Sequence, residues 1–194
     1  MLIAFEGIDG SGKTTISTRV NEELLKRGIR SYWTTEPTDG PIGEIIRDVL
    51  EGRIKVDHRA LALLFAADRM QHVIQLKDLL DKGYTVISDR YLLSSLAYQG
   101  CDLPIEWVRE INKWALLPDL VIYLDLDPAI ALERVKGKQL FHSLHRLKEI
   151  RANYLSLIRE EEWSHRTILV DASKDVEKVY KTVLNIILEK LRVI

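Results

Sequence analysis

Cysteine, long apolar runs and an excess of charge of one sign are scarce or absent in this sequence. The single cysteine, Cys101, rules out a disulfide within the chain, and we expect it to be a small buried residue in a reducing cytosol. No apolar run approaches the roughly 18 residues of a membrane span. The 28 basic and 29 acidic side chains leave a net charge of −1, which gives no global attraction to nucleic acid or acidic lipid. We therefore expect a cytoplasmic protein with neither nucleic acid nor membrane as a partner, in which any phosphate binding is local.

Linkers of low complexity and internal repeats are absent too, and 194 residues suffice for one α/β domain but not for two. Short, continuously apolar segments predict strands covered on both faces at 2–6, 84–88, 119–125 and 167–170, with a weaker candidate at 30–34. Helical patterns lie between them, and the last helix is expected to begin at Ser173. This alternation predicts a doubly wound α/β fold, with residues 1–194 as a single domain.

One predicted helix, over residues 57–81, has apolar residues on almost every side. A helix of this kind is buried on every side, whereas the sheet of one domain covers only one face. We therefore predict that its other face meets a second copy of the chain across a two-fold axis. The alternative is a helix fully internal to one subunit.

A complete phosphate-binding loop follows the first predicted strand and precedes a helix. It has the form G-x-x-x-x-G-K-[ST] and reads Gly7-Ile8-Asp9-Gly10-Ser11-Gly12-Lys13-Thr14. Its glycines allow successive N–H groups to face one anion, and the helix N-terminus adds a partial positive charge. Lys13 is expected to reach the β and γ phosphates, and Thr14 to offer its hydroxyl to Mg²⁺.

This loop alone leaves three classes of protein open: a small-molecule kinase, a GTP-driven switch and a motor ATPase. A switch carries an N-K-x-D guanine motif, but Asn112-Lys113 is followed by Trp114 and Ala115, without the aspartate. A motor ATPase carries an acidic catalytic residue beside its second acidic strand. The strand 119–125 ends in Asp125-Leu126-Asp127-Pro128, which has no adjacent glutamate. The kinase interpretation is favoured.

Arginines near the ends of predicted elements suggest where a phosphorylated acceptor binds. Arg90 follows a strand directly, and the ligand crevice of an open parallel sheet lies beyond the carboxyl ends of its strands. Phe65 and Arg69 are four residues apart and share a helix face, which suits a base and a phosphate. Arg47 is a further candidate on a predicted helix. Phe65 as an ordinary core residue remains an alternative.

Several motifs, in order along nearly the whole chain, resemble those of thymidylate kinases. The most specific is Asp89-Arg90-Tyr91-Leu92-Leu93-Ser94-Ser95-Leu96-Ala97-Tyr98-Gln99-Gly100. The others are Phe5 to Thr15, Glu36-Pro37, Leu64 to Arg69, Tyr123 to Pro128, Leu132-Glu133-Arg134 and Val170 to Ser173. The resemblance implies a P-loop NTPase fold of three layers, with five parallel strands flanked by helices, and a homodimer. It also implies the reaction of ATP with dTMP to give ADP and dTDP, with Mg²⁺ as cofactor.

The resemblance also implies roles for individual residues. Phe65 would stack on thymine, Arg69 and Gln99 would bond the base and phosphate region, and Arg47 and Arg90 would bind the acceptor phosphate. Asp9 would hold the sugar 3′-hydroxyl, Tyr98 would exclude a ribose 2′-hydroxyl, and Asp89 would hold Mg²⁺ through water together with Thr14. The implied substrate site consists of Asp9, Glu36, Pro37, Arg47, Phe65, Arg69, Arg90, Ser95, Tyr98 and Gln99. The implied ATP site consists of Gly7, Ile8, Asp9, Gly10, Ser11, Gly12, Lys13, Thr14, Thr15, Arg134 and Ala172.

Two positions depart from the pattern of relatives. Thr35 stands where many relatives have arginine, and Gly10 stands where some relatives have a P-loop arginine. Relatives without the latter use arginines of a mobile lid, which we expect at about 135–146. The candidate lid cations are Arg134, Lys136, Lys138, His142, His145 and Arg146, and the sequence leaves the choice among them open.

Phosphoryl transfer depends mainly on alignment and on positive charge at the moving group, so Lys13, Arg90, Mg²⁺ held by Asp89, and one lid cation are the predicted catalytic groups. The acceptor phosphate is already an anion and needs no general base. A deoxynucleoside kinase, with Glu36 as base, is the alternative, followed by another nucleotide-dependent P-loop protein.

Overall fold

The computed structural model describes residues 1–134 and 143–192. A five-stranded sheet with the order β2-β3-β1-β4-β5 forms its middle layer, and each neighbouring pair of strands is parallel. The strands are β1 (Leu2–Glu6), β2 (Ser31–Thr35), β3 (Thr85–Asp89), β4 (Leu120–Asp125) and β5 (Thr167–Asp171). The predicted three-layer α/β fold with five parallel strands is confirmed.

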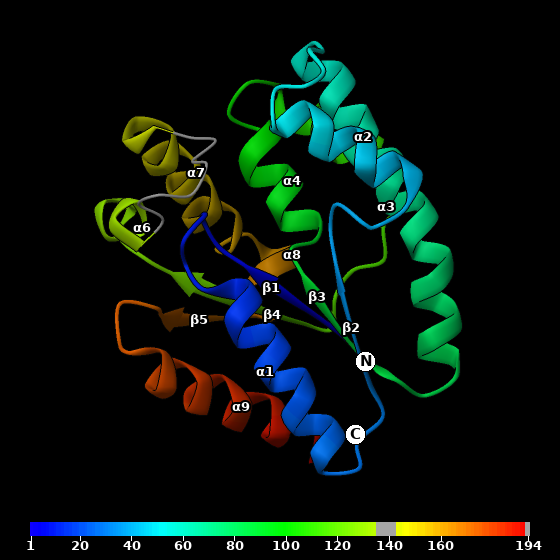
Figure 1. Cartoon of the computed structure of the whole chain (residues 1–194), viewed down its shortest axis with the longest axis vertical. Coiled ribbons are helices and arrows are strands. Elements are labelled where there is room, and N and C mark those ends of the chain that lie inside the picture. The colour runs from blue at the N-terminus through cyan, green and yellow to red at the C-terminus, as the bar shows by residue number, and fades with distance from the viewer. Residues whose placement is uncertain (135–142, 193–194) are drawn as a thin grey trace.

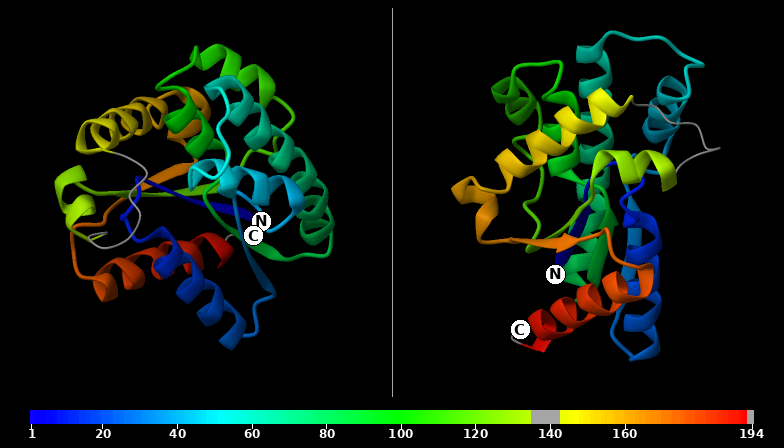
Figure 2. Two further views of the ribbon diagram at one scale, coloured as in Figure 1. Left: turned by 45° about the horizontal axis from the view of Figure 1, so that its top comes forward. Right: turned by 90° about the vertical axis from the view of Figure 1, so that its left-hand side faces the viewer.

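Helices cover both faces of this sheet (Figure 1). They are α1 (Lys13–Lys26), α2 (Pro41–Leu50), α3 (His58–Asp81), α4 (Leu92–Gln99), α5 (Ile105–Ile111), α6 (Pro128–Arg134), α7 (Leu144–Leu157), α8 (Glu161–Ser164) and α9 (Val176–Arg192). Helices α1 and α9 pack together on one face, and α3, α4 and α7 lie on the other (Figure 2). None of the helices among the described residues combines the length and the hydropathy needed to cross a membrane.

Strand burial follows the position of each strand in the sheet. Every residue of β1 and β3 is buried, and so are five of the six residues of β4, because these strands have a neighbour on each side and helices on both faces. The edge strands β2 and β5 are largely half-buried or exposed, which accounts for the weak sequence signal at 30–34. In the central register Phe5 lies between Asp89 of β3 and Ile122 of β4, so the carboxyl ends of these strands meet at one edge.

Several predicted strand boundaries differ from the structure by one residue, and the start of the last helix differs by three. Strand β3 lies one residue later than the predicted 84–88, so Asp89 closes the strand. The last helix begins at Val176 and not at Ser173, because Ser173 donates its N–H and hydroxyl to Asp171 Oδ1 in a turn. Asp175 Oδ1 accepts the N–H groups of Glu177 and Lys178 and caps the helix in its place.

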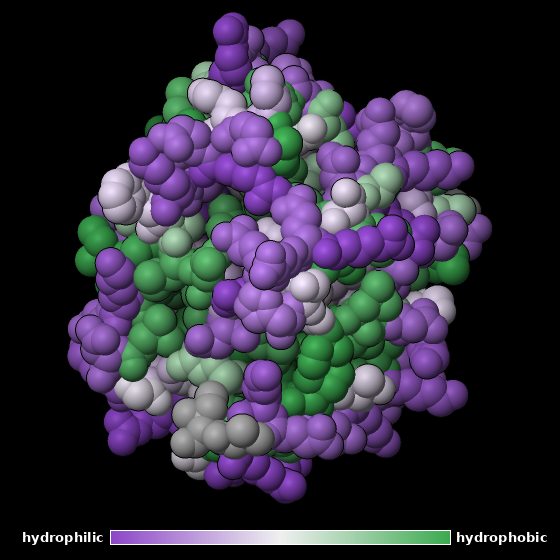
Figure 3. All heavy atoms as spheres, turned by 180° about the vertical axis from the view of Figure 1, so that it is seen from behind, coloured by the Kyte–Doolittle hydropathy of each residue, from purple (hydrophilic) through white to green (hydrophobic). Residues whose placement is uncertain are grey.

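The long helix α3 buries one side against the sheet and its neighbouring helices. Ala62, Ala66, Val73 and Leu76 lie on that side, whereas Leu63 and Ile74 on the opposite side are 49% and 64% exposed. The alternative of a helix fully internal to one subunit is therefore wrong. Apolar side chains also reach the surface in patches between polar ones on the rear of the molecule (Figure 3).

Candidate active site

The loop between β1 and α1 has the backbone that its glycines require. Gly7 and Gly10 adopt φ values of 146° and 82°, which L side chains rarely reach. A Cβ atom on Gly7 would lie 2.7 Å from the carbonyl oxygen of Leu124, and one on Gly10 would lie 2.8 Å from that of Ala131. Both positions therefore require glycine, and the loop is held against β4 and α6.

Lys13, the first residue of α1, lies folded over this loop and is 5% exposed. Its Nζ donates to the carbonyl oxygens of Gly7 at 2.9 Å and Ile8 at 2.8 Å. Burial, followed by the repulsion of Arg90, lowers the pKa of Lys13 to about 8. A bound polyphosphate would favour the charged ammonium and so raise this pKa.

We predict from this pKa that ATP binding weakens as the pH rises. In the free protein Lys13 loses its proton near pH 8, so binding above that pH must take up a proton, and affinity falls by about tenfold between pH 7 and pH 9. Isothermal titration of ATP across this range checks the slope. Lys13→Arg is the matched control, because its guanidinium stays charged throughout. Equal slopes for the two proteins would contradict the prediction.

An oxygen pair suited to a magnesium ion lies beside the loop. The hydroxyl of Thr14 donates to Asp89 Oδ2 at the end of β3, and Asp89 is 5% exposed. The other carboxylate oxygen, Oδ1, is buried and has no hydrogen-bond partner among the described residues. Mg²⁺ usually binds one or two protein oxygens together with water and substrate phosphates, so Thr14 and Asp89 fit such a site.

Arg90 has an unusual backbone conformation directly after β3. Its φ is 68°, the only positive value of a non-glycine residue in the described chain. Its N–H donates to Phe5 O at 2.9 Å, and its carbonyl accepts from Ser88 Oγ at 2.7 Å. Strained conformations of this kind cluster at functional sites, where the surroundings hold them in place.

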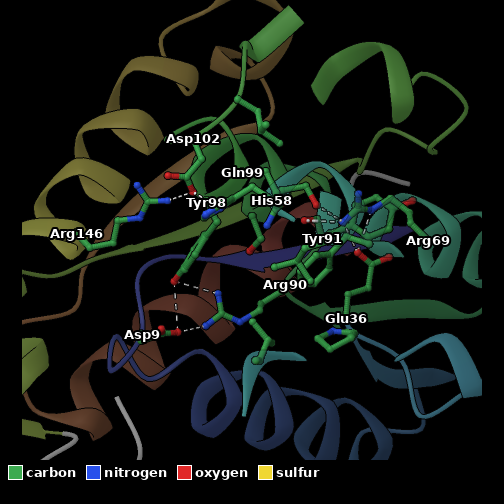
Figure 4. A pocket seen from close by; sticks show the side chains of 17 residues that line it. Asp9, Glu36, His58, Arg69, Arg90, Tyr91, Tyr98, Gln99, Asp102 and Arg146 are labelled. Atoms are coloured by element: carbon green, nitrogen blue, oxygen red, sulfur yellow. Dashed lines mark hydrogen bonds and ion pairs between the residues drawn. The ribbon is translucent and has the colours of Figure 1, made fainter. Parts of the chain in front are cut away.

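This backbone directs the Arg90 guanidinium toward the phosphate loop (Figure 4). There Nη2 pairs with Asp9 Oδ1, and Nη1 donates to the hydroxyl of Tyr98 at 3.3 Å. The Tyr98 hydroxyl also donates to Asp9 Oδ1 at 3.3 Å, and burial raises the pKa of Tyr98 well above its usual range. Three residues predicted to contact the acceptor thus form one hydrogen-bonded group.

A cavity of about 470 Å³ opens beside this group. Nine of the ten predicted substrate residues line it: Asp9, Glu36, Pro37, Phe65, Arg69, Arg90, Ser95, Tyr98 and Gln99. Arg47 does not; its Nη1 donates to Thr38 O at 2.7 Å in the loop that follows Pro37. Gln99 Oε1 is buried without a hydrogen-bond partner in the described chain, so it is an acceptor available to a ligand.

A buried ionic network forms the wall of the cavity that contains Arg69. Arg69 is 1% exposed, and its Nε and Nη2 donate to Glu36 Oε2 at 2.9 and 2.7 Å. Asn112 and Ser95 accept further bonds from the guanidinium, and His72 contacts the other oxygen of Glu36. Sequence reasoning missed His72 and Asn112. His72 follows Arg69 by three residues and therefore lies on the same side of α3. This spacing is the one sequence feature that could have predicted His72 as a neighbour of the site.

The predicted adenine side lies at the carboxyl ends of β4 and β5. The N–H of Ala172 donates to Asp125 O at 2.8 Å, and Arg134 at the end of α6 lies 3.5 Å from the carbonyl of Ser173. Arg134 and Ala172 are thus near neighbours, as their common assignment requires.

Much of the predicted lid lies outside the described residues, including Lys136, Lys138 and His142. Of the described lid candidates, His145 is 85% exposed beside Glu149. Arg146 lines the cavity and pairs with Asp102, which also contacts His58 Nδ1 at 3.2 Å. Among the lid candidates that the structure describes, Arg146 is therefore the one that lines the cavity.

Comparison with known proteins gives a consistent result. The sequence model of the family described as thymidylate kinase matches residues 5–183. A probable thymidylate kinase of Methanocaldococcus jannaschii is 42% identical over 186 residues, which cover 95% of this chain and 94% of the relative. Another, from Staphylothermus marinus, is 42% identical over 97% of this chain and 95% of its own. A third, from Thermococcus kodakarensis, is 40% identical over 96% of this chain and 97% of its own. The chain belongs to the thymidylate kinase family.

Proposed function

We propose that this protein transfers the γ-phosphoryl group of ATP to dTMP, giving ADP and dTDP. The observation that carries the proposal is the cavity of about 470 Å³ beside the phosphate loop, lined by nine of the residues assigned to the acceptor. Family membership and the names of the relatives support the same reaction.

In the proposed mechanism the chain aligns two anions and neutralises the charge between them. Lys13 exchanges its bonds to loop carbonyls for bonds to the ATP phosphates, and the loop N–H groups hold the phosphate chain. The guanidinium of Arg90 binds the acceptor phosphate. Its contacts with Asp9 and Tyr98 hold the guanidinium at the boundary between the two substrates. Mg²⁺, held by Thr14 and Asp89, would supply further positive charge to the phosphates.

The base edge of the cavity suits thymine. A guanidinium has five N–H groups, and the bonds of Arg69 to Glu36, Ser95, Tyr91 O and Asn112 leave one Nη1 hydrogen without an acceptor among the described residues. That donor and the acceptor Gln99 Oε1 complement a carbonyl next to a ring N–H. Phe65, also in the lining, offers a stacking surface.

The deoxynucleoside kinase alternative is disfavoured by the state of Glu36. A general base must be free to accept a proton from the acceptor hydroxyl. Both carboxylate oxygens of Glu36 are engaged, Oε2 by Arg69 and Oε1 by His72. An assay that couples ADP formation to absorbance, with dTMP or thymidine as acceptor, tests this choice. The proposal requires turnover of dTMP and fails if thymidine is the better acceptor.

We also propose a homodimer in which α3 packs against its copy, with the cytoplasm as its location. The exposed Leu63 and Ile74 give α3 an apolar outer side, and the single half-buried thiol, Cys101, suits a reducing compartment.

The dimer makes a prediction about Ile74. Ile74→Glu should convert the protein to a monomer at micromolar concentration, because it places an unpaired carboxylate in an apolar contact. Light scattering measures the mass, and Leu25→Glu on α1, which is 52% exposed in the wild type, is the matched control. A monomeric wild-type protein, or a dimer that survives Ile74→Glu, would contradict the proposal.

A further inference from the structure

Two residues on the buried side of α3 hold the same carboxylate from opposite ends. Arg69 bonds Glu36 Oε2, and His72 Nδ1 lies 3.0 Å from Glu36 Oε1. All three are buried, with exposed fractions of 1% for Arg69, 2% for His72 and 3% for Glu36. Glu36 and Arg69 line the acceptor cavity, whereas His72 lies behind them and does not.

The protonation of the histidine ring follows from its partners. A carboxylate oxygen only accepts hydrogen bonds, so Nδ1 of His72 carries a hydrogen and donates it to Glu36. On the other side of the ring, Nε2 lies 2.9 Å from Thr34 Oγ1 on β2. With a partner at each nitrogen, the ring is fixed in its plane between β2 and Glu36.

Removing the His72 bond would leave one oxygen of a buried carboxylate without a partner. Such an oxygen is costly, and the carboxylate would turn to find another donor. Because Nε and Nη2 of Arg69 both bond Oε2, a turn of Glu36 carries the guanidinium with it. The guanidinium of Arg69, which lines the cavity, would then meet a ligand at a different angle.

We infer that His72 is a positioning residue for recognition of the pyrimidine base, acting through Glu36 on Arg69. The inference rests on the proposed function, because it gives the fixed guanidinium a thymine carbonyl to bind. It makes His72 matter for acceptor affinity and for the choice between thymine and cytosine, but not for ATP. A histidine that served only to fill the core would affect stability and no particular substrate.

Two substitutions separate the ring nitrogens. The amide of asparagine lies at the distance of Nδ1 from the backbone, and the amide of glutamine at the distance of Nε2. His72→Asn therefore keeps a donor for Glu36 and loses Thr34, whereas His72→Gln keeps Thr34 and loses Glu36. In Thr34→Val the valine has the same shape as the threonine, so this variant removes only the hydrogen bond to Nε2 of His72 and disturbs the fold least.

The test compares these variants by thermal unfolding, by calorimetric titration of dTMP without ATP, and by steady-state kinetics with dTMP, dCMP and ATP. For His72→Gln we expect KM and Kd for dTMP to rise about tenfold, with KM for ATP unchanged and a smaller preference for dTMP over dCMP. For His72→Asn we expect values within about threefold of wild type at a comparable loss of Tm. Thr34→Val should shift dTMP affinity in the same direction as His72→Gln, by about two- to threefold.

The positioning role is overturned if His72→Asn and His72→Gln change dTMP affinity equally, if KM for ATP rises in parallel, or if the preference for dTMP over dCMP is unchanged. Should a histidine variant fail to fold, Thr34→Val decides, and unaltered dTMP affinity in that variant overturns the role. A wild-type protein that binds no dTMP overturns the proposed function as well, so the two failures are distinguishable.

Discussion

Replacing Lys13 with alanine is expected to lower kcat by about two to three orders of magnitude while leaving the fold intact. The buried ammonium of Lys13 lies within the phosphate loop. In the proposed mechanism it faces the charge that develops on the moving phosphoryl group. The loop backbone depends on its glycines and on contacts to β4 and α6, so it survives without the side chain. Steady-state kinetics with saturating ATP and dTMP measures the effect.

The control is Lys26→Ala, which removes an exposed lysine at the far end of the same helix. It should match the wild type in kcat, and circular dichroism should show both variants folded. If Lys13→Ala retained more than about a tenth of the wild-type kcat, the assignment of this lysine to the reaction would be wrong.

The second large effect concerns the choice among acceptors. The methyl group that dUMP lacks costs only about 1 kcal/mol, so dUMP should follow dTMP within roughly tenfold in kcat/KM. Cytosine presents an amino group where Arg69 needs an acceptor, and an unpaired buried donor costs about 1–3 kcal/mol. We therefore expect kcat/KM for dCMP to be one to two orders of magnitude lower than for dTMP, because Arg69 would be left with this unpaired donor.

Purine monophosphates should be the poorest acceptors, because the base side of the cavity, between Phe65 and Arg69, is expected to take one ring. A coupled assay with dTMP, dUMP, dCMP, dAMP and dGMP at equal concentrations gives the order directly. Arg69→Ala should weaken all three pyrimidine substrates, whereas Tyr98→Ala should mainly relax the rejection of ribonucleotides. A purine that proved the best acceptor would contradict the assignment of the base edge while leaving the phosphate loop in place.

Local chemistry made the phosphate side of the site predictable from sequence. The conformation of the loop depends on residues that adjoin one another, from Gly7 to Thr14, and the neighbouring strand and helix are evident from apolar patterning. The central strands were predicted for the same reason. The start of the last helix was wrong because Ser173 and Asp175 are both good caps, and the contact of Ser173 with Asp171 decides between them.

The acceptor side depends on contacts between distant parts of the chain. Glu36 directly follows β2, Arg69 lies on α3 and Asn112 directly follows α5, and no spacing in the sequence predicts that they meet. Resemblance to a family supplied most of the lining, but it could not supply His72, which lies outside the lining and acts on it through Glu36. Arg47, assigned to the acceptor phosphate, is not itself part of the lining, but its Nη1 donates to the carbonyl oxygens of Thr38 and of Pro37, which does line the cavity, so its assignment stays a prediction.

The central claim is that dTMP receives a phosphoryl group from ATP at this site. Its most direct test is chromatographic separation of the nucleotides after the purified wild-type protein has been incubated with ATP, Mg²⁺ and dTMP, alongside parallel reactions with thymidine and without acceptor. The account predicts equal amounts of dTDP and ADP with dTMP, and little ADP in the other two reactions. ADP formed at the same rate without acceptor, or dTMP produced from thymidine in preference to dTDP from dTMP, would contradict it.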